Sequence, residues 1–183
     1  QLSYIVLGIA ILSPLSTAGA LYHLVAHAFM KITLFMCAGA IFVTTHKKDI
    51  SEMVGLGRRM PVTMSAFTIA SLGIAGFPFF VGFVSKANII MGALKTGQLL
   101  FGATLIVSAV LALTYLMPVV LITFKREPVN PEFNTYGEAS KTMLVPLLIT
   151  ATVSVILGVA PNFGLHLLDL AMSTGEAVFA HVG

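Results

Sequence analysis

The chain has 183 residues, of which 57% are hydrophobic and only 9% are charged, and its formal net charge is +3. Soluble domains carry about 25% charged residues, so this composition indicates an integral membrane protein and excludes an ordinary soluble domain. The positive charge lies in loops, where it indicates membrane topology rather than a nucleic-acid partner. The one cysteine, Cys37, lies within an apolar segment and cannot form a disulfide inside the chain.

The apolar segments predict an all-α, polytopic bundle with about five transmembrane helices, one of them long and one discontinuous. In chain order the helices are expected over about residues 1–12, 16–45, 61–94, 98–124 and 143–172. At about 1.5 Å per residue the first segment is too short to span a bilayer, and it has no flanking anchor. We therefore expect this sequence to be part of a longer or a split polypeptide.

The second segment, 16–45, contains three ionisable side chains at a spacing of four, namely His23, His27 and Lys31. This spacing places them on one helix face, with neighbouring groups about 6 Å apart along the axis. A lysine at membrane depth costs about 2.5–3.5 kcal/mol, and all seven acidic residues lie in loops or near the chain end. The stripe therefore predicts an ion pathway, with the helix irregular or hydrated beside Lys31.

Two other interpretations of this stripe remain open. A membrane histidine often only joins neighbouring helices by a hydrogen bond. Two histidines at i and i+4 can also bind zinc, but no carboxylate or further thiol at membrane depth completes a ligand set, and Lys31 would repel the ion. We therefore expect no metal.

The third segment, 61–94, is too long for one straight span, because about 34 helical residues would extend about 50 Å across a hydrocarbon core of about 30 Å. Gly76, Pro78 and Gly82 interrupt it. Pro78 has no N–H and would clash with the carbonyl four residues earlier, so a break is expected at Gly76–Pro78. Lys86 would then lie in the second half-helix, facing the bundle interior and displaced outward from Lys31. The alternative is an interfacial lysine whose ammonium extends to the membrane surface.

Two basic loops predict the orientation of the chain in the membrane. The loop 46–60 contains Lys47, Lys48, Arg58 and Arg59, and the loop 125–142 contains Lys125, Arg126 and Lys141. Two spans separate the loops, so they share one side, and the positive-inside tendency predicts that this side is cytoplasmic. The C-terminus is then expected outside a multi-pass inner, or cytoplasmic, membrane.

The sequence contains no motif for phosphate binding or for iron–sulfur ligation. The glycines lie in apolar segments rather than at a strand-to-helix turn, so they predict no phosphate-binding loop. One cysteine cannot ligate an iron–sulfur cluster. We therefore expect no cofactor, and no redox or hydrolytic catalysis by this chain itself, although it could be a subunit of an ion-translocating oxidoreductase.

Two motifs resemble a known family. The sequence from His23 through His27 and Lys31 to Cys37-Ala-Gly-Ala is similar to the signature helix of proton-conducting antiporter-like membrane subunits. These include Mrp-type cation/proton antiporter subunits and related subunits of respiratory complex I and of membrane-bound hydrogenases. Gly76-Phe-Pro-Phe-Phe-Val-Gly82-Phe-Val-Ser-Lys86 resembles their discontinuous helix, although Phe79 replaces a second proline. The resemblance is specific through Lys86 and extends to about Phe124, and a weak further likeness favours the antiporter D-type branch.

The resemblance implies that residues 1–124 are most of the second of two inverted repeats and that 143–172 is a terminal transmembrane helix. The first repeat, with its glutamate–lysine pair, is absent. It implies proton translocation, or sodium/proton exchange, along Lys31, Lys86, His23 and His27. The implied partners are the N-terminal half, other membrane subunits and lipid. The alternative is a non-translocating scaffold of a respiratory or hydrogenase-type redox complex.

Overall fold

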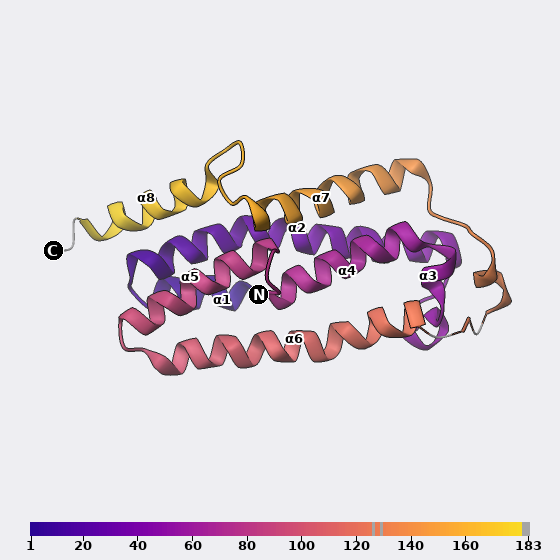
Figure 1. Ribbon diagram of the computed structural model, residues 1–183, viewed down its shortest axis with the longest axis horizontal. Coiled ribbons are helices and arrows are strands. Elements are labelled where there is room, and N and C mark those ends of the chain that lie inside the picture. Colours follow the sequence, from indigo (N-terminus) through magenta and orange to yellow (C-terminus); the bar gives the residue numbers. More distant parts are fainter. Residues whose placement is uncertain (126, 129, 181–183) are drawn as a thin grey trace.

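The structure, a computed structural model, describes residues 1–125, 127–128 and 130–180. These residues form an elongated bundle of α-helices with two short 3-10 helices, η1 and η2 (Figure 1). The elements are α1 (Leu2–Ala10), α2 (Pro14–Thr45), η1 (Ile50–Met53), α3 (Leu56–Arg59), α4 (Pro61–Ala75), α5 (Val81–Lys95), α6 (Leu99–Lys125), η2 (Pro131–Asn134), α7 (Lys141–Val159) and α8 (Leu167–Ala180). The expectations for Arg126 and for the C-terminus itself lie outside the described residues.

Helix α2 is the central element of the bundle and packs against α1, α4, α5, α7 and α8. It begins with Pro14 at its first turn, where the missing N–H has no helical partner to lose. It ends at Thr45, and the following cap residue, His46, adopts the left-handed conformation with a φ of 55°. Helices α2, α6 and α7 are long and apolar enough to cross a membrane, and α4 is a shorter apolar helix.

Small residues bring α2 and α5 into close contact. A methyl group added at Gly92 would lie 2.7 Å from the backbone nitrogen of Ser16, and one added at Gly19 would lie 2.8 Å from that of Ile89. Larger side chains at either glycine would push the helices apart. Close backbone approach through small residues is a usual basis of helix packing in membranes. Lipid tails are as apolar as the side chains, so the hydrophobic effect does not drive the helices together there.

The structure confirms the discontinuous helix. Helix α4 ends at Ala75, and the following cap residue, Gly76, has a φ of 85°, which only glycine readily adopts. The backbone N–H groups of Gly76 and Phe77 both donate to the carbonyl of Leu72, each at 3.0 Å, which closes the helix end. Helix α5 begins at Val81, and the link between them contains Pro78.

The last apolar segment differs from the expected single helix over 143–172. Helix α7 ends at Val159, because the following Pro161 has no N–H with which to continue the helical bonding. The separate helix α8 begins at Leu167. The side chain of Asn162 accepts from the backbone N–H of Asp169 at 3.0 Å and donates to its carboxylate at 2.7 Å, which fixes the turn between the helices.

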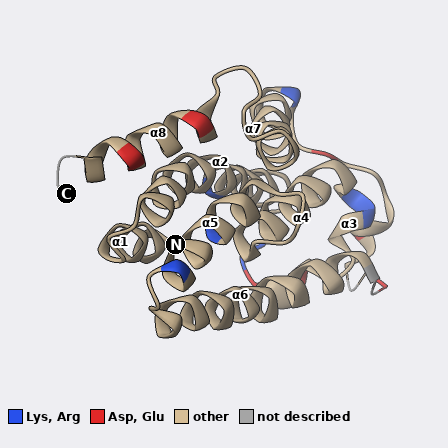
Figure 2. Ribbon diagram, turned by 60° about the vertical axis from the view of Figure 1, so that its left-hand side comes forward, with Lys and Arg blue, Asp and Glu red and all other residues tan. Residues whose placement is uncertain are grey.

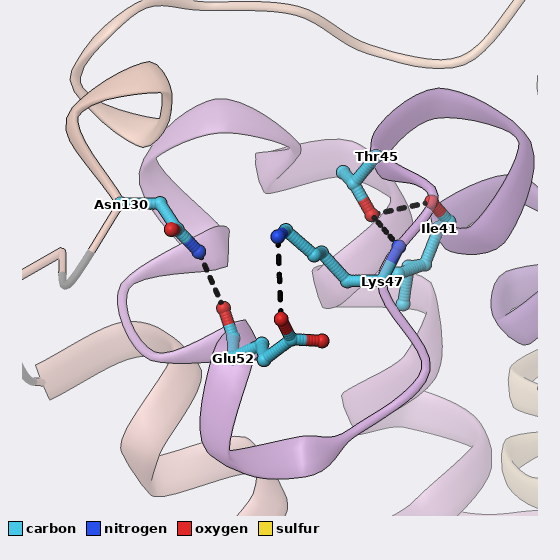
Figure 3. A network of polar contacts seen from close by, with 5 residues as sticks. All are labelled: Ile41, Thr45, Lys47, Glu52 and Asn130. Atoms are coloured by element: carbon cyan, nitrogen blue, oxygen red, sulfur yellow. Dashed lines mark hydrogen bonds and ion pairs between the residues drawn. The ribbon is translucent and has the colours of Figure 1, made fainter.

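The two basic loops lie at the same end of the bundle, as the two intervening spans predict (Figure 1). The guanidinium of Arg59 donates to the carbonyl of Glu132 at 2.9 Å, and the amide of Asn130 donates to the carbonyl of Glu52 at 3.0 Å. Figure 3 shows this second contact beside the ion pair of Lys47 with Glu52, whose atoms are 3.2 Å apart. Most of the helical ribbon carries no charged residue (Figure 2).

Candidate functional site at the helix break

Lys86 is buried in the first turns of α5, with 4% of its surface exposed. Its ammonium donates to the carbonyl of Ile74 at 2.6 Å. Ile74 lies four residues before Pro78, so no helical N–H is available to its carbonyl. Gly76 leaves room for the lysine, since a methyl group there would lie 3.0 Å from the Cδ of Lys86. The break therefore creates the acceptor that holds the buried ammonium.

His23 is fully buried on α2 beside the same break. Its Nδ1 is 2.8 Å from the hydroxyl of Ser85, and its Nε2 is 3.2 Å from the side-chain oxygen of Gln1. The neutral tautomer that carries its proton on Nε2 satisfies both hydrogen bonds. The amide of Gln1 in turn donates to the carbonyl of Ile74 at 3.3 Å. His23 and Lys86 thus share a polar network around one backbone oxygen.

Tyr4 of α1 completes the surroundings of Lys86. The ammonium lies 4.8 Å from the centre of the Tyr4 ring, within the range of a cation–π interaction. The same ring meets His23 edge-on, with 5.6 Å between ring centres. The Tyr4 hydroxyl is hydrogen-bonded to that of Ser108 on α6. The site therefore joins five helices: α1, α2, α5 and α6 through these side chains, and α4 through the carbonyl of Ile74.

His27 and Lys31 continue along α2 away from this network. The rings of His27 and His23 are stacked, with their centres 6.3 Å apart, and His27 is partly buried. Lys31 is exposed, and its ammonium lies 5.2 Å from the centre of the Phe35 ring. The helix is regular at Lys31, so of the two expected forms, an irregular helix or hydration beside the lysine, the first is wrong and the second stays a prediction. Because this backbone keeps its helical bonds and the ammonium contacts an aromatic face, the helix accommodates the lysine without a distortion.

The structure thus brings His23, His27 and Lys86 into one neighbourhood, whereas Lys31 lies apart from it on the exposed face. The predicted break residues surround Lys86: Gly76 contacts it, Pro78 leaves the Ile74 carbonyl free, and Gly82 packs directly against the backbone of Gly73, with no room for a side chain. The sequence patterns did not point to Gln1, Tyr4 or Ser108. Polar groups in apolar segments were the available signal, but only the fold shows that they meet Lys86.

The groups in this arrangement are chemically suited to proton transfer. Imidazole and hydroxyl groups both accept and donate protons, and an amine can release one. Removal from water disfavours the charged form of a lysine, so a buried ammonium is a group that can lose and regain a proton. The neighbours of Lys86 described above carry no charge. Only His23 could carry one, when it is protonated.

Several helices long and apolar enough to cross a membrane, a broken helix and a buried lysine at the break define a polytopic helical membrane protein with an ionisable group inside its helix bundle. Residues 1–112 match the family model described as "NADH:quinone oxidoreductase/Mrp antiporter, TM". The chain belongs to this family.

Related proteins come from both branches of the family. The chain is 36% identical over 169 residues to the NADH-quinone oxidoreductase subunit N of Desulforudis audaxviator, a match that covers 86% of this chain and 34% of that protein. It is 30% identical over 160 residues to a Na⁺/H⁺ antiporter subunit of Alkalihalophilus pseudofirmus, covering 87% of this chain and 32% of that one. The chain therefore spans about a third of the length of these curated relatives.

The same fold occurs in a solved structure of the Mrp complex from Dietzia sp. DQ12-45-1b. The match has a TM-score of 0.86 and 23% sequence identity, and it covers 96% of this chain and 40% of the other. This likeness confirms the all-helical, antiporter-like fold. Together with the family match it identifies the chain as a membrane-integral, multi-pass protein.

Proposed function

We propose that this chain translocates protons across a membrane as part of a multi-subunit complex. Membership of the family supports the proposal, because the relatives are named as subunits of NADH-quinone oxidoreductase and of a Na⁺/H⁺ antiporter. Sodium/proton exchange is the second ion chemistry that these names support. The other membrane subunits of such a complex, and the remaining part of a longer subunit, are the proposed partners.

The observation that carries the proposal is the position of Lys86. A charged group in a membrane interior is costly and is retained where it serves an ion pathway. Lys86 is 4% exposed, and its one described acceptor is a carbonyl at a helix break. This ammonium has no carboxylate within salt-bridge distance among the described residues, so its charge is not neutralised by a structural ion pair. A lysine in this setting is suited to exchanging a proton.

The proposed pathway runs from Lys31 through His27 and His23 to Lys86. Lys86 lies at the level of His23, because its neighbour Ser85 is bonded to that histidine. His23 precedes Lys31 by eight residues on α2, or about 12 Å along the axis. Lys86 is therefore displaced from Lys31 away from the basic loops. If these loops are cytoplasmic, as their charge favours, Lys86 is the outer terminus of the pathway.

The test is proton flux in proteoliposomes that contain the complex assembled with variants of this chain. Lys86→Ala should abolish coupled flux, whereas Lys95→Ala, an exposed lysine at the end of the same helix, should transport normally. Lys86→Arg should also fail, since arginine keeps its charge but cannot release a proton in a protein. Normal assembly and normal flux in Lys86→Ala would contradict the proposal and favour the scaffold alternative.

A further inference from the structure

A groove of about 670 Å³ lies between α1 and α6, directly beside the Lys86 site. Its walls are mostly apolar, and the side chains in its lining that carry polar atoms all carry hydroxyl groups: Ser3, Tyr4, Thr104 and Ser108. Two of these, Tyr4 and Ser108, are hydrogen-bonded to each other across the two helices. Hydroxyl groups can pass protons along a chain without taking a lasting charge, because each accepts at its oxygen while it donates its own hydrogen.

The groove extends from the Lys86 site toward the end of the bundle opposite the basic loops. Helix α1 runs from Leu2, near the middle of the bundle, to Ala10 at that end (Figure 1). On α6, Thr104 lies one helical turn nearer to this end than Ser108. At the end itself the side-chain amide of Gln98 donates to the carbonyl of Ile11 at 3.2 Å, which ties the two helices together.

Tyr4 has two separate contacts that make it a bridge between the lysine and the groove. Its ring faces the ammonium of Lys86 at 4.8 Å from the ring centre, and its hydroxyl contacts Ser108 at the edge of the groove. The residue is 8% exposed, so the bridge is shielded from the surroundings of the bundle. A water molecule between the ammonium and the phenol oxygen would connect the two groups for proton transfer.

We propose that the hydroxyl pair of Tyr4 and Ser108 forms the proton outlet of this chain, connecting Lys86 with water in the groove between α1 and α6. The inference rests on the proposed function and assigns residues to its outer step. One proton leaves the ammonium through the bridging water to the Tyr4 oxygen, and the phenol proton passes to Ser108. Ser108 releases its own hydroxyl proton to water in the groove, so each hydroxyl is left neutral. Reversal of these steps reloads the lysine.

The ring and the hydroxyl of Tyr4 have different tasks, and this makes the proposal testable. Tyr4→Phe keeps the aromatic face over Lys86 and removes only the relay hydroxyl. At position 108, threonine and valine have nearly the same shape and differ by one hydroxyl, so Ser108→Thr and Ser108→Val are a matched pair. Thr114→Val is the control, because Thr114 is an exposed residue of α6 whose hydroxyl donates to Leu111 of its own helix at 2.7 Å.

The experiment measures the initial rate of proton flux against pH in proteoliposomes of the assembled complex, with thermal unfolding as a check on folding. Tyr4→Phe and Ser108→Val should each lower the rate by about a hundredfold, the low end of the contribution of a positioned proton-transfer group. Ser108→Thr and Thr114→Val should retain it. Because the two hydroxyls act as one unit, the double variant of Tyr4→Phe with Ser108→Val should be no slower than either single variant.

The result separates this inference from the proposed function. If Lys86→Ala is inactive while Tyr4→Phe and Ser108→Val transport normally, the outlet lies elsewhere and the proposed function stands. If Lys86→Ala transports normally, the proposed function itself fails. Equal flux in Ser108→Thr and Ser108→Val, or losses that add independently in the double variant, would show that Tyr4 and Ser108 only pack α1 against α6, and would overturn the outlet.

Discussion

At the scale of single residues, one backbone oxygen organises the site. The carbonyl of Ile74 accepts from the ammonium of Lys86 and from the amide of Gln1, because Pro78 cannot supply the helical N–H. An unpaired polar group at membrane depth costs several kcal/mol, about as much as a buried hydrogen-bonding group loses in an apolar solvent. The broken helix therefore supplies an acceptor for the lysine, and the lysine together with Gln1 supplies donors for the freed carbonyl.

Lys31 provides a residue-scale prediction for the other end of the proposed pathway. Lys31→Ala should strongly lower proton flux, and Lys31→Arg should preserve it only in part, because arginine keeps the charge without releasing a proton. Lys48→Ala is a matched control, since its ammonium also lies over a phenylalanine ring, at 5.3 Å from the centre of Phe42. Flux in Lys31→Arg equal to that of the unmodified protein would show that proton exchange at Lys31 is unnecessary.

At the scale of elements, the start of α4 depends on a carboxylate from a distant loop. Glu138 accepts from the backbone N–H of Val62 at 2.5 Å and from the hydroxyl of Thr63 at 2.7 Å. A helix start has backbone N–H groups without helical partners and a partial positive charge, and a carboxylate satisfies both. Since α4 leads directly to the break, this contact also fixes the first half of the discontinuous helix.

We expect Glu138→Ala to destabilise the protein by about 1–2 kcal/mol, the usual cost of losing a helix-capping side chain. The measurement is thermal unfolding of the detergent-solubilised protein, in which the variant should have the lower Tm. Glu132→Ala is the control, because Glu132 is exposed and its described hydrogen bonds use its backbone oxygen. Equal Tm values for the two variants would mean that water replaces the Glu138 contacts at no cost.

At the scale of the whole molecule, the bundle has one basic end and one end poor in charged loops. The loops 46–60 and 125–142 meet at the first end, where Gly137 donates its backbone N–H to the carbonyl of Arg59 at 3.0 Å. The short link between α5 and α6, with Lys95, lies at the other. The positive-inside tendency therefore predicts that the basic end faces the cytoplasm.

Cysteine labelling tests this orientation. Ser51→Cys and Thr135→Cys, both at exposed positions of the basic end, should react with a membrane-impermeant maleimide only from the cytoplasmic side. Lys95→Cys should react only from the opposite side. The native thiol of Cys37 is fully buried and serves as the internal background. Labelling of Ser51→Cys from the outer side would reverse the orientation and with it the direction of the proposed outlet.

The sequence by itself determined the helical membrane fold, the break and the lysine that follows it. Apolar content and the position of Pro78 act locally, through desolvation and the missing N–H, so they can be recognised without knowledge of distant contacts. Pro161 could have predicted the end of α7 by the same reasoning. The segments on both sides of it are both hydrophobic, however, so the sequence was interpreted as one helix over 143–172.

Only the tertiary structure decided which groups surround Lys86 and how far Lys31 is exposed. Helical spacing places His23, His27 and Lys31 on one face, but it does not specify which helix packs against each turn of that face. Tyr4 and Ser108 are 104 residues apart in the chain, and their contact depends on how α1 and α6 pack around α5. Such contacts are set by side-chain volume and close helix approach over the whole bundle, which local sequence patterns do not encode.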